Sequence, residues 1–426
     1  MQIIDNLKVK EKLYIEKLEN GLTVMVIPKK DIQKKYMIWG TNYGSNESTF
    51  VIPGEEKKTK VPNGVAHFLE HKLFEQENGT NSLDVLTALG VDANAYTTND
   101  HTAYLFECTD NFYEAMDELM DYVQHPYFTD ENVEKEKGII GQEIMMYDDY
   151  PEWKVYLNSM KAMYHENPVK IDIVGTQESI SKIDKEILYK CYNTFYNPSN
   201  MAMVICGDFE PEKLIEEVKK RLVKVQPKGE IKRIYPNEPT TIVKERIEEN
   251  LEVSMPLYAI GIKDIINPNS VKTEMIKRHI AIEILLNILI GKSSSLYREL
   301  YNNGIIFGQP ELDYEFTKIY AHIIVAGQAT NPELVYEKFK AEVEKNKNNG
   351  INKEDFERTK KMIYGSYIKE YNEPADISRM FLADYFKGIN SFDYLEEIGS
   401  ITKEYAEQIL KEVFEEKRMV LSVVKS

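Results

Sequence analysis

The chain has 426 residues, which is more than one ordinary hydrophobic core accommodates, so its length predicts two or more domains. Its composition, with 42% hydrophobic and 29% charged residues, is typical of a soluble globular protein. The 70 acidic residues outnumber the 53 basic ones, giving a net charge of −17, and no basic run is interleaved with aromatic residues, so nucleic acid is excluded as an expected partner.

The N-terminal residues and the hydropathy pattern predict a location. The first residues have neither a basic head nor an apolar stretch of signal-peptide length, and nowhere do about 18 apolar residues run together. We therefore expect a cytoplasmic protein with no membrane partner. Cys108, Cys191 and Cys206 lack the spacing of metal ligands and are interpreted as buried structural thiols.

In chain order, the first predicted element is a β-hairpin within residues 14–29. Asn20-Gly21 separates two runs of alternating apolar residues, and this dipeptide accepts the positive φ angles of a tight turn. A strand is predicted at residues 36–43, followed by a polar loop that leads to Gly64.

The stretch after Gly64 carries the most informative motif. A helix that advances about 100° per residue places His67, Glu70 and His71 within one arc of roughly 100°, opposite an apolar side. Two imidazoles four residues apart can share one metal ion, and their neutral nitrogens suit Zn²⁺. The order His-x-x-Glu-His is the inverted zincin signature, with the glutamate beside the metal. The alternative is two core or surface histidines that fall four residues apart by coincidence.

The region after this motif predicts helices and strands in turn. Residues 81–89 form an amphipathic helix pattern that ends at Gly90, as a helix with a glycine stop does. Two strands are predicted at residues 91–98 and 103–108, and a further helix at residues 111–125.

A second helix of chemical interest is predicted at residues 131–147. Glu136 and Glu143 lie two turns apart and project from nearly the same side, with Ile140 between them. Seven residues at about 1.5 Å rise separate the two carboxylates by roughly 10 Å, so at most one of them can bind the same zinc as the histidines. The alternative for each is a solvated helix face, although Ile140 indicates partial burial.

The remaining elements repeat a similar order on either side of a proline-containing linker. The predicted boundaries are a first α+β domain at residues 1–225, a linker at 226–240 and a second domain at 241–426. Helices are predicted at residues 156–164, 181–195, 211–222, 274–290, 293–301, 332–347 and 353–370. Strands are predicted at residues 202–206, 246–262 and 320–326, with a helix and a strand within 403–424. The similar order suggests an ancient duplication.

Together these features resemble the insulinase and mitochondrial-processing-peptidase family of inverted-motif zinc metallopeptidases, and in particular its bacterial processing-peptidase-like members. The resemblance covers nearly all of the first half and rests on Asn20-Gly21-Leu22, residues 64–71, Asn94-Ala95-Tyr96-Thr97, residues 134–143, Gly175-Thr176 and residues 196–201. It implies an α+β fold of two homologous domains, each an antiparallel-rich sheet packed with helices, that form half of a clam-shell chamber.

The resemblance also implies roles for the site residues. In the family, the glutamate that closes the carboxylate run is the third zinc ligand, and the glutamate seven residues earlier supports the site without binding metal. The implied zinc ligands are thus His67, His71 and Glu143, with Glu136 supporting them. Glu70 would act as general base and then general acid during hydrolysis.

Substrate binding and assembly follow from the same resemblance. Asn94, Ala95 and Tyr96 would lie on an exposed edge strand to which a peptide adds as a further strand. Self-sufficient members carry in their second half an arginine and a tyrosine that contact substrate and stabilise the oxyanion. Here Tyr301 and Phe307 stand at those positions, and Arg298 is out of register. We therefore expect a heterodimer with a metal-free paralogue that supplies both groups, with a homodimer as the second possibility.

Three functions are compatible with these features. The favoured one is a zinc-dependent endopeptidase of the cytosol that hydrolyses small or unfolded peptides with metal-activated water. The alternative is a subunit that keeps zinc but serves as a scaffold or peptide-binding module of a heteromeric complex. Glu70 weighs against that alternative, because a scaffold needs no general base. A third possibility is a protein without metal in which the motif is coincidental.

Overall fold

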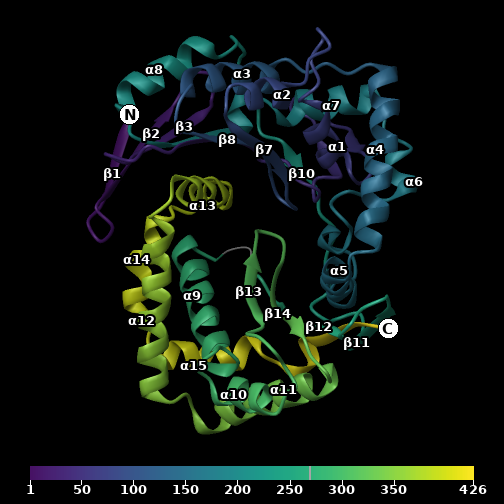
Figure 1. Ribbon diagram of the computed structural model, residues 1–426, viewed down its shortest axis with the longest axis vertical. Coiled ribbons are helices and arrows are strands. Elements are labelled where there is room, and N and C mark those ends of the chain that lie inside the picture. Colours follow the sequence, from purple (N-terminus) through teal and green to yellow (C-terminus); the bar gives the residue numbers. More distant parts are fainter. Residues whose placement is uncertain (268–269) are drawn as a thin grey trace. The chain divides into compact units, whose positions relative to one another are not determined.

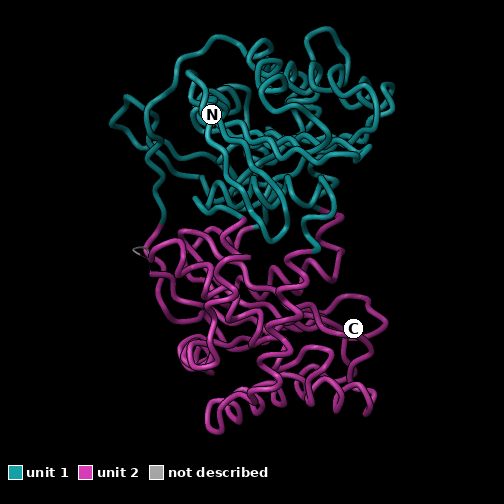
Figure 2. Tube along the Cα trace, turned by 90° about the vertical axis from the view of Figure 1, so that its left-hand side faces the viewer, with its two compact units in different colours: residues 1–144, 172–235, 369–391 teal, residues 145–171, 236–368, 392–426 magenta. Residues whose placement is uncertain are grey.

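The structure is a computed structural model that describes residues 1–267 and 270–426 (Figure 1). The chain forms two compact units, which Figure 2 distinguishes by colour. Unit 1 comprises residues 1–144, 172–235 and 369–391, and unit 2 comprises residues 145–171, 236–368 and 392–426.

Unit 1 is built on a seven-stranded sheet in the order β1-β2-β3-β9-β4-β8-β7, in which β7 is an edge strand. Every neighbouring pair is antiparallel except β3 and β9. The strands are β1 (Gln2–Asn6), β2 (Glu11–Lys17), β3 (Thr23–Pro28), β4 (Lys35–Thr41), β7 (Asp92–Thr97), β8 (Thr102–Cys108) and β9 (Met201–Gly207). A smaller sheet has the order β10-β5-β6 and contains β5 (Thr49–Val51), β6 (Lys58–Lys60) and β10 (Lys232–Arg233).

Helices cover both faces of the large sheet. On one face α1 and α3 pack against β8, and on the other face α13 packs against β4 and β9. A Cβ atom on Gly40 of β4 would lie 2.8 Å from the Leu382 side chain of α13, so the absence of a side chain lets this helix approach closely. The helices of this unit are α1 (Val65–Lys72), α2 (Ser82–Ala88), α3 (Phe112–Gln124), α4 (Asp130–Asp148, whose last turn belongs to unit 2), α6 (Gln177–Ile180), α7 (Lys185–Phe195), α8 (Pro211–Arg221) and α13 (Pro374–Lys387).

Unit 2 contains a five-stranded sheet in the order β11-β15-β12-β14-β13, antiparallel except for the pair β11 and β15. Its strands are β11 (Arg246–Asn250), β12 (Leu257–Asp264), β13 (Glu311–Phe316), β14 (Ala321–Gln328) and β15 (Met419–Lys425). Its helices are α5 (Pro151–Met163), α9 (Lys272–Leu289), α10 (Ser295–Asn302), α11 (Pro332–Asn349), α12 (Lys353–Glu370, whose end belongs to unit 1), α14 (Phe392–Glu397) and α15 (Lys403–Val413). The predicted α+β class, with an antiparallel-rich sheet packed with helices in each part, is confirmed.

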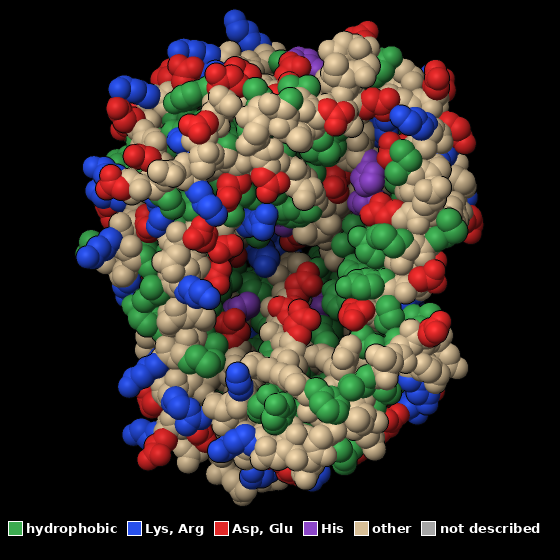
Figure 3. All heavy atoms as spheres, viewed as in Figure 1, with side chains coloured by type: hydrophobic (Ala, Val, Ile, Leu, Met, Phe, Trp, Pro, Cys, Tyr) green, Lys and Arg blue, Asp and Glu red, His purple; other side chains and the backbone are tan. Residues whose placement is uncertain are grey.

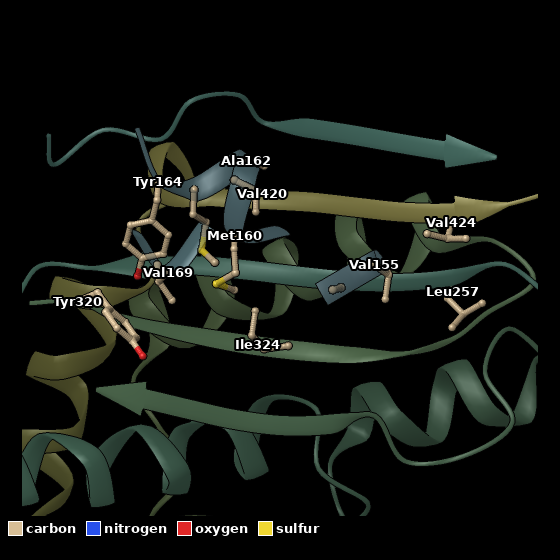
Figure 4. Packing of buried hydrophobic residues seen from close by; sticks show 12 residues of the cluster. Val155, Met160, Ala162, Tyr164, Val169, Leu257, Tyr320, Ile324, Val420 and Val424 are labelled. Atoms are coloured by element: carbon tan, nitrogen blue, oxygen red, sulfur yellow. The ribbon is translucent and has the colours of Figure 1, made fainter. Parts of the chain in front are cut away.

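One face of the sheet in unit 2 is covered by α5. Figure 4 shows Met160 and Ala162 of this helix packed against side chains of β12, β14 and β15, including Ile324 and Val420. These side chains are almost fully buried, and burial of one such aliphatic side chain stabilises a fold by about 1.5–3 kcal/mol. The helix that follows α4 in sequence therefore contributes to the core of unit 2.

Each compact unit contains one helix from the half of the sequence that otherwise forms the other unit. Residues 145–171, with α5, leave the first half for unit 2, and residues 369–391, with α13, leave the second half for unit 1. The predicted division at 1–225, 226–240 and 241–426 follows the order of elements along the sequence, whereas the compact units follow packing, and the division stays a prediction.

Several predicted elements differ from the structure. The run at residues 246–262 is two strands, β11 and β12, because residues 251–256, which end in Pro256, belong to neither strand. The helix predicted from residue 181 begins at Lys185, where the Asp184 side chain caps it by accepting from the Ile187 N–H. The sequence analysis omitted β1, β13 and α13, although Pro374 and Gly388 mark the two ends of α13.

The distribution of charged side chains and the hydropathy of the helices are those of a chain with this composition. On the face of the molecule in Figure 3, Lys and Arg side chains are interspersed with Asp and Glu. No helix in the described part of the chain combines the length and the apolar character that a membrane crossing requires.

A buried carboxyl group in unit 1 makes its stability depend on pH. Glu47 accepts hydrogen bonds from the Gly44 N–H at 2.8 Å and from the Tyr235 hydroxyl at 2.6 Å, and its carboxylate lies 3.8 Å from Arg233 Nε. Burial raises the pKa of Glu47 to about 7, although Arg233 and both hydrogen bonds oppose this shift.

The pKa of Glu47 is higher in the folded state than in the unfolded state, so its protonated form stabilises the fold. We predict that this stabilisation is complete below pH 4.5 and is lost as the pH rises to 7. A Glu47→Gln variant should become more stable relative to the wild type over this interval, by roughly 3 kcal/mol at most. Urea unfolding at pH 5 and pH 8 measures the change, with the exposed Glu55→Gln as control. An equal effect of Glu47→Gln at both pH values would contradict the prediction.

Candidate metal centre

The inverted motif lies on α1, which begins after Gly64 and contacts β7, β8 and α7. Gly64 has a φ of 91°, and a Cβ atom there would lie 2.7 Å from the Val174 carbonyl oxygen, so only glycine fits this position. The sequence predicts one chemical face and one apolar face, but the structure buries every residue of α1 except His71, which is half-buried. The polar side chains of this helix therefore depend on partners from other elements.

His67, His71 and Glu143 converge although they come from two helices. His67 Nε2 lies 3.6 Å from one carboxylate oxygen of Glu143, and His71 Nε2 lies 3.6 Å from the other. One ligand atom from each residue lies within 4.8 Å of the others. Two imidazole nitrogens and one carboxylate oxygen are the donor set of many catalytic zinc sites, so these residues could hold a metal ion.

Glu136 occupies a different place from Glu143. Its Oε1 lies 3.0 Å from His71 Nδ1, on the side of the ring away from Glu143. Its Oε2 lies 3.7 Å from the buried Lys72 Nζ. The two glutamates thus take different places, with Glu143 facing both histidines and Glu136 behind one of them.

Glu70 is held by a residue of β7. The Thr97 hydroxyl donates to Glu70 Oε2 at 2.6 Å and also lies 3.2 Å from the Thr102 hydroxyl. The sequence analysis assigned no role to Thr97 or to Lys72. Thr97 closes the motif Asn94-Ala95-Tyr96-Thr97, and Lys72 directly follows the second histidine, so adjacency to recognised motifs was the available signal.

The electrostatics of the site reflect burial and an excess of carboxylates. Burial and the neighbouring His71 lower the pKa of His67 to about 3, so this ring is neutral and able to bind metal. Burial raises the pKa of Glu70, as does the Glu143 charge, against the Thr97 hydrogen bond and His71. Burial and the charges of Asp172 and Glu136 likewise raise the pKa of Glu143. A dication would compensate these carboxylates, and the residues present therefore fit a metal ion.

The three residues expected to bind substrate lie on β7. This strand pairs with β8 alone among the described strands, so its other side is a free edge of the sheet. The Ala95 N–H donates to Asn94 Oδ1 at 2.9 Å. The Asn94 side chain is exposed, and Ala95 and Tyr96 are half-buried. Thr97 at the end of this strand bonds Glu70, so the free edge lies beside the centre.

The residues expected to replace an arginine and a tyrosine belong to unit 2. Tyr301 lies near the end of α10 with 50% of its surface exposed, and Phe307 lies in the following loop with 57% exposed. Arg298, also on α10, is exposed and donates from Nε to the Ser294 carbonyl oxygen at 3.3 Å.

Two family models match consecutive parts of the chain. The model described as "Insulinase (Peptidase family M16)" matches residues 49–177, which include α1 and α4. The model described as "Peptidase M16 inactive domain" matches residues 182–363. The candidate metal ligands thus all lie within the first matched segment.

Two individual proteins are similar over nearly the whole chain, and a third is similar over half of it. "Uncharacterized zinc protease YmfH" of Bacillus subtilis (strain 168) is 38% identical over 98% of this chain and 97% of its own length. A crystal structure of an M16-like peptidase from Alicyclobacillus acidocaldarius has 33% identity and a TM-score of 0.92, covering 97% of this chain and 98% of that one. A probable mitochondrial-processing peptidase subunit beta from Arabidopsis thaliana is 25% identical over 50% of this chain and 41% of its own.

We predict that replacing His67, His71 or Glu143 by Ala releases most of the bound metal, because a site with two ligands retains little affinity. Metal content of each purified variant, measured by mass spectrometry, checks this. His125→Ala is a matched control, since His125 pairs with Asp121 at 3.0 Å on the surface. Full occupancy in Glu143→Ala would assign the third ligand elsewhere, with Glu136 as the next candidate.

Proposed function

Since this chain belongs to the insulinase family of peptidases, family M16, we propose that it is a zinc-dependent endopeptidase of the cytosol that hydrolyses small or unfolded peptides. The observation that carries the proposal is the convergence of His67, His71 and Glu143 beside Glu70. The zinc-protease names of its relatives support the choice of metal.

We propose His67, His71 and Glu143 as the zinc ligands and Glu70 as the general base. Zinc bound there would lower the pKa of a water molecule to about 7 and polarise the scissile carbonyl. Glu70 would accept a proton from the attacking water and deliver it to the leaving amine, while the Thr97 hydroxyl fixes the orientation of its carboxylate. Glu136 orients His71 through Nδ1 and completes the set.

We propose that substrates bind by adding a strand to β7 at Asn94, Ala95 and Tyr96. Backbone hydrogen bonds on an edge strand accept varied side chains but require an extended, accessible peptide. Extended peptides should therefore be cleaved while compact proteins are not, and a peptidase assay with both classes measures this. Efficient cleavage of a compact protein with intact disulfides would contradict strand addition.

A heterodimer with a metal-free paralogue is the assembly we propose, and a homodimer is the second possibility. Phe307 cannot donate a hydrogen bond, and Tyr301 cannot supply a fixed positive charge, so this chain lacks the oxyanion groups of self-sufficient members at these positions. The exposure of both aromatic side chains and the subunit name of the Arabidopsis relative support a partner. The same observations favour the alternative function, a zinc-retaining scaffold or peptide-binding subunit.

We predict that Glu70→Gln keeps its zinc and loses peptide hydrolysis by a factor of about 10² to 10⁴, because the amide preserves shape but cannot accept a proton. Metal analysis and a fluorogenic peptide assay on the same preparation measure both properties. Glu131→Gln, at an exposed position on α4, is the control. Undiminished turnover by a zinc-replete Glu70→Gln protein would remove Glu70 from its role.

We predict that the purified chain alone is a weak peptidase and that its metal-free paralogue increases the rate about 10² to 10³-fold, the usual contribution of oxyanion donors. Assays of the chain alone and of the mixture, with gel filtration to detect the complex, measure this effect. A fully active isolated chain that neither binds nor responds to the paralogue would refute the divided site and make Arg298 the residue to mutate.

A further inference from the structure

Lys72 is a buried charge beside the metal centre. Its side chain is 1% exposed, its Nζ bonds the Glu75 carboxylate, and it lies 3.7 Å from Glu136 Oε2. A lysine is almost never fully buried unless it is paired, because removal of an ammonium group from water is costly. The position of Lys72 in the core therefore depends on these two glutamates.

Lys72 and His71 hold the two oxygens of one carboxylate. Glu136 Oε1 faces His71 Nδ1 at 3.0 Å, while Oε2 faces the lysine. An ionised carboxylate only accepts hydrogen bonds, so His71 donates from Nδ1. This tautomer leaves the lone pair on Nε2, the nitrogen that lies 3.6 Å from Glu143.

The other imidazole, that of His67, has no comparable support. His67 Nδ1 is buried and has no hydrogen-bond partner among the described residues. The orientation of one of the two imidazoles is thus fixed by a side chain, and that side chain is Glu136. In the described structure, His71 and Lys72 are the two residues that contact the Glu136 carboxylate within 4 Å as hydrogen-bond or ion-pair partners.

We propose that Lys72 is a positioning residue for the metal centre, which holds Glu136 so that His71 presents Nε2 to the ion. This inference rests on the proposed zinc function. Lys72 acts through Glu136 and His71 and does not itself contact substrate or metal. This ion pair differs from an ordinary buried one, because the Glu136 carboxylate that Lys72 holds also accepts the hydrogen bond of His71.

Lys263 in unit 2 provides the contrast. It is also buried, with 3% of its side chain exposed, and it bonds the Glu238 carboxylate. Glu238 additionally accepts backbone N–H groups of three consecutive residues, His165, Glu166 and Asn167. Glu238 would keep its place without the lysine, whereas Glu136 would lose one of its two partners. Lys263→Met therefore controls for removal of a buried lysine far from any metal ligand in the sequence.

The test measures zinc affinity by competition with a chelator for the wild type, Lys72→Met and Lys263→Met. We expect Lys72→Met to bind zinc 10- to 100-fold more weakly, as loss of groups that orient metal ligands typically does, and Lys263→Met to match the wild type. Equal affinity of wild type and Lys72→Met, or equal losses in both variants, would overturn the proposal. A wild type that binds no zinc would instead refute the metal site itself.

A double variant separates positioning from packing. If Lys72 acts through Glu136, adding Lys72→Met to Glu136→Gln should weaken zinc binding no further than Glu136→Gln alone. If instead the losses of zinc affinity from the two substitutions multiply, Lys72 acts by another route and the inference is overturned. Circular dichroism identifies folded variants. Should Lys72→Met not fold, Lys72→Gln replaces it, because its neutral amide removes the charge that faces the Glu136 carboxylate, and wild-type affinity in that variant would overturn the proposal equally.

Discussion

Burial of α1 is the constraint on which the centre depends. Within eight residues this helix places two imidazoles, a carboxylate and an ammonium group largely out of water. Each such group costs free energy unless a partner compensates it, so the neighbouring elements must supply partners. The long helix α4 contributes two glutamates that lie two turns apart, and β7 contributes a hydroxyl. The arrangement that could bind a metal is thus also the arrangement that makes this helix stable where it is.

Spacing within single elements was predictable from the sequence. The four-residue step between His67 and His71 places both rings on one side of a helix, and the rings lie 4.5 Å apart between centroids. The seven-residue step between Glu136 and Glu143 predicted that only one of them reaches one ion, and in the structure Glu143 faces both histidines while Glu136 contacts His71 Nδ1. Local turn and cap signals also located elements well, since Asn20-Gly21 joins β2 to β3 and the Asn81 side chain caps α2.

Relations between distant elements were not predictable in the same way. Periodicity does not determine how α4 is rotated against α1, so the choice between the two glutamates came from the family resemblance rather than from spacing. The partnership of Thr97 with Glu70 depends on the edge position of β7, which follows from the order of the whole sheet. Lys72 was inconspicuous because a lysine beside a motif is usually a solvated residue, and only its packing reveals a buried partner of Glu136.

The exchange of α5 and α13 between the compact units has a consequence for biosynthesis. All strands of the large sheet in unit 1 are complete by residue 207, whereas α13, which buries the sheet face at Gly40, begins at Pro374. During translation, more than a hundred residues must follow before Leu382 and Phe386 can cover that apolar face. The nascent chain therefore exposes part of this core to solvent and to chaperones until synthesis is nearly finished, so the two halves of the sequence cannot fold to their final cores one after the other.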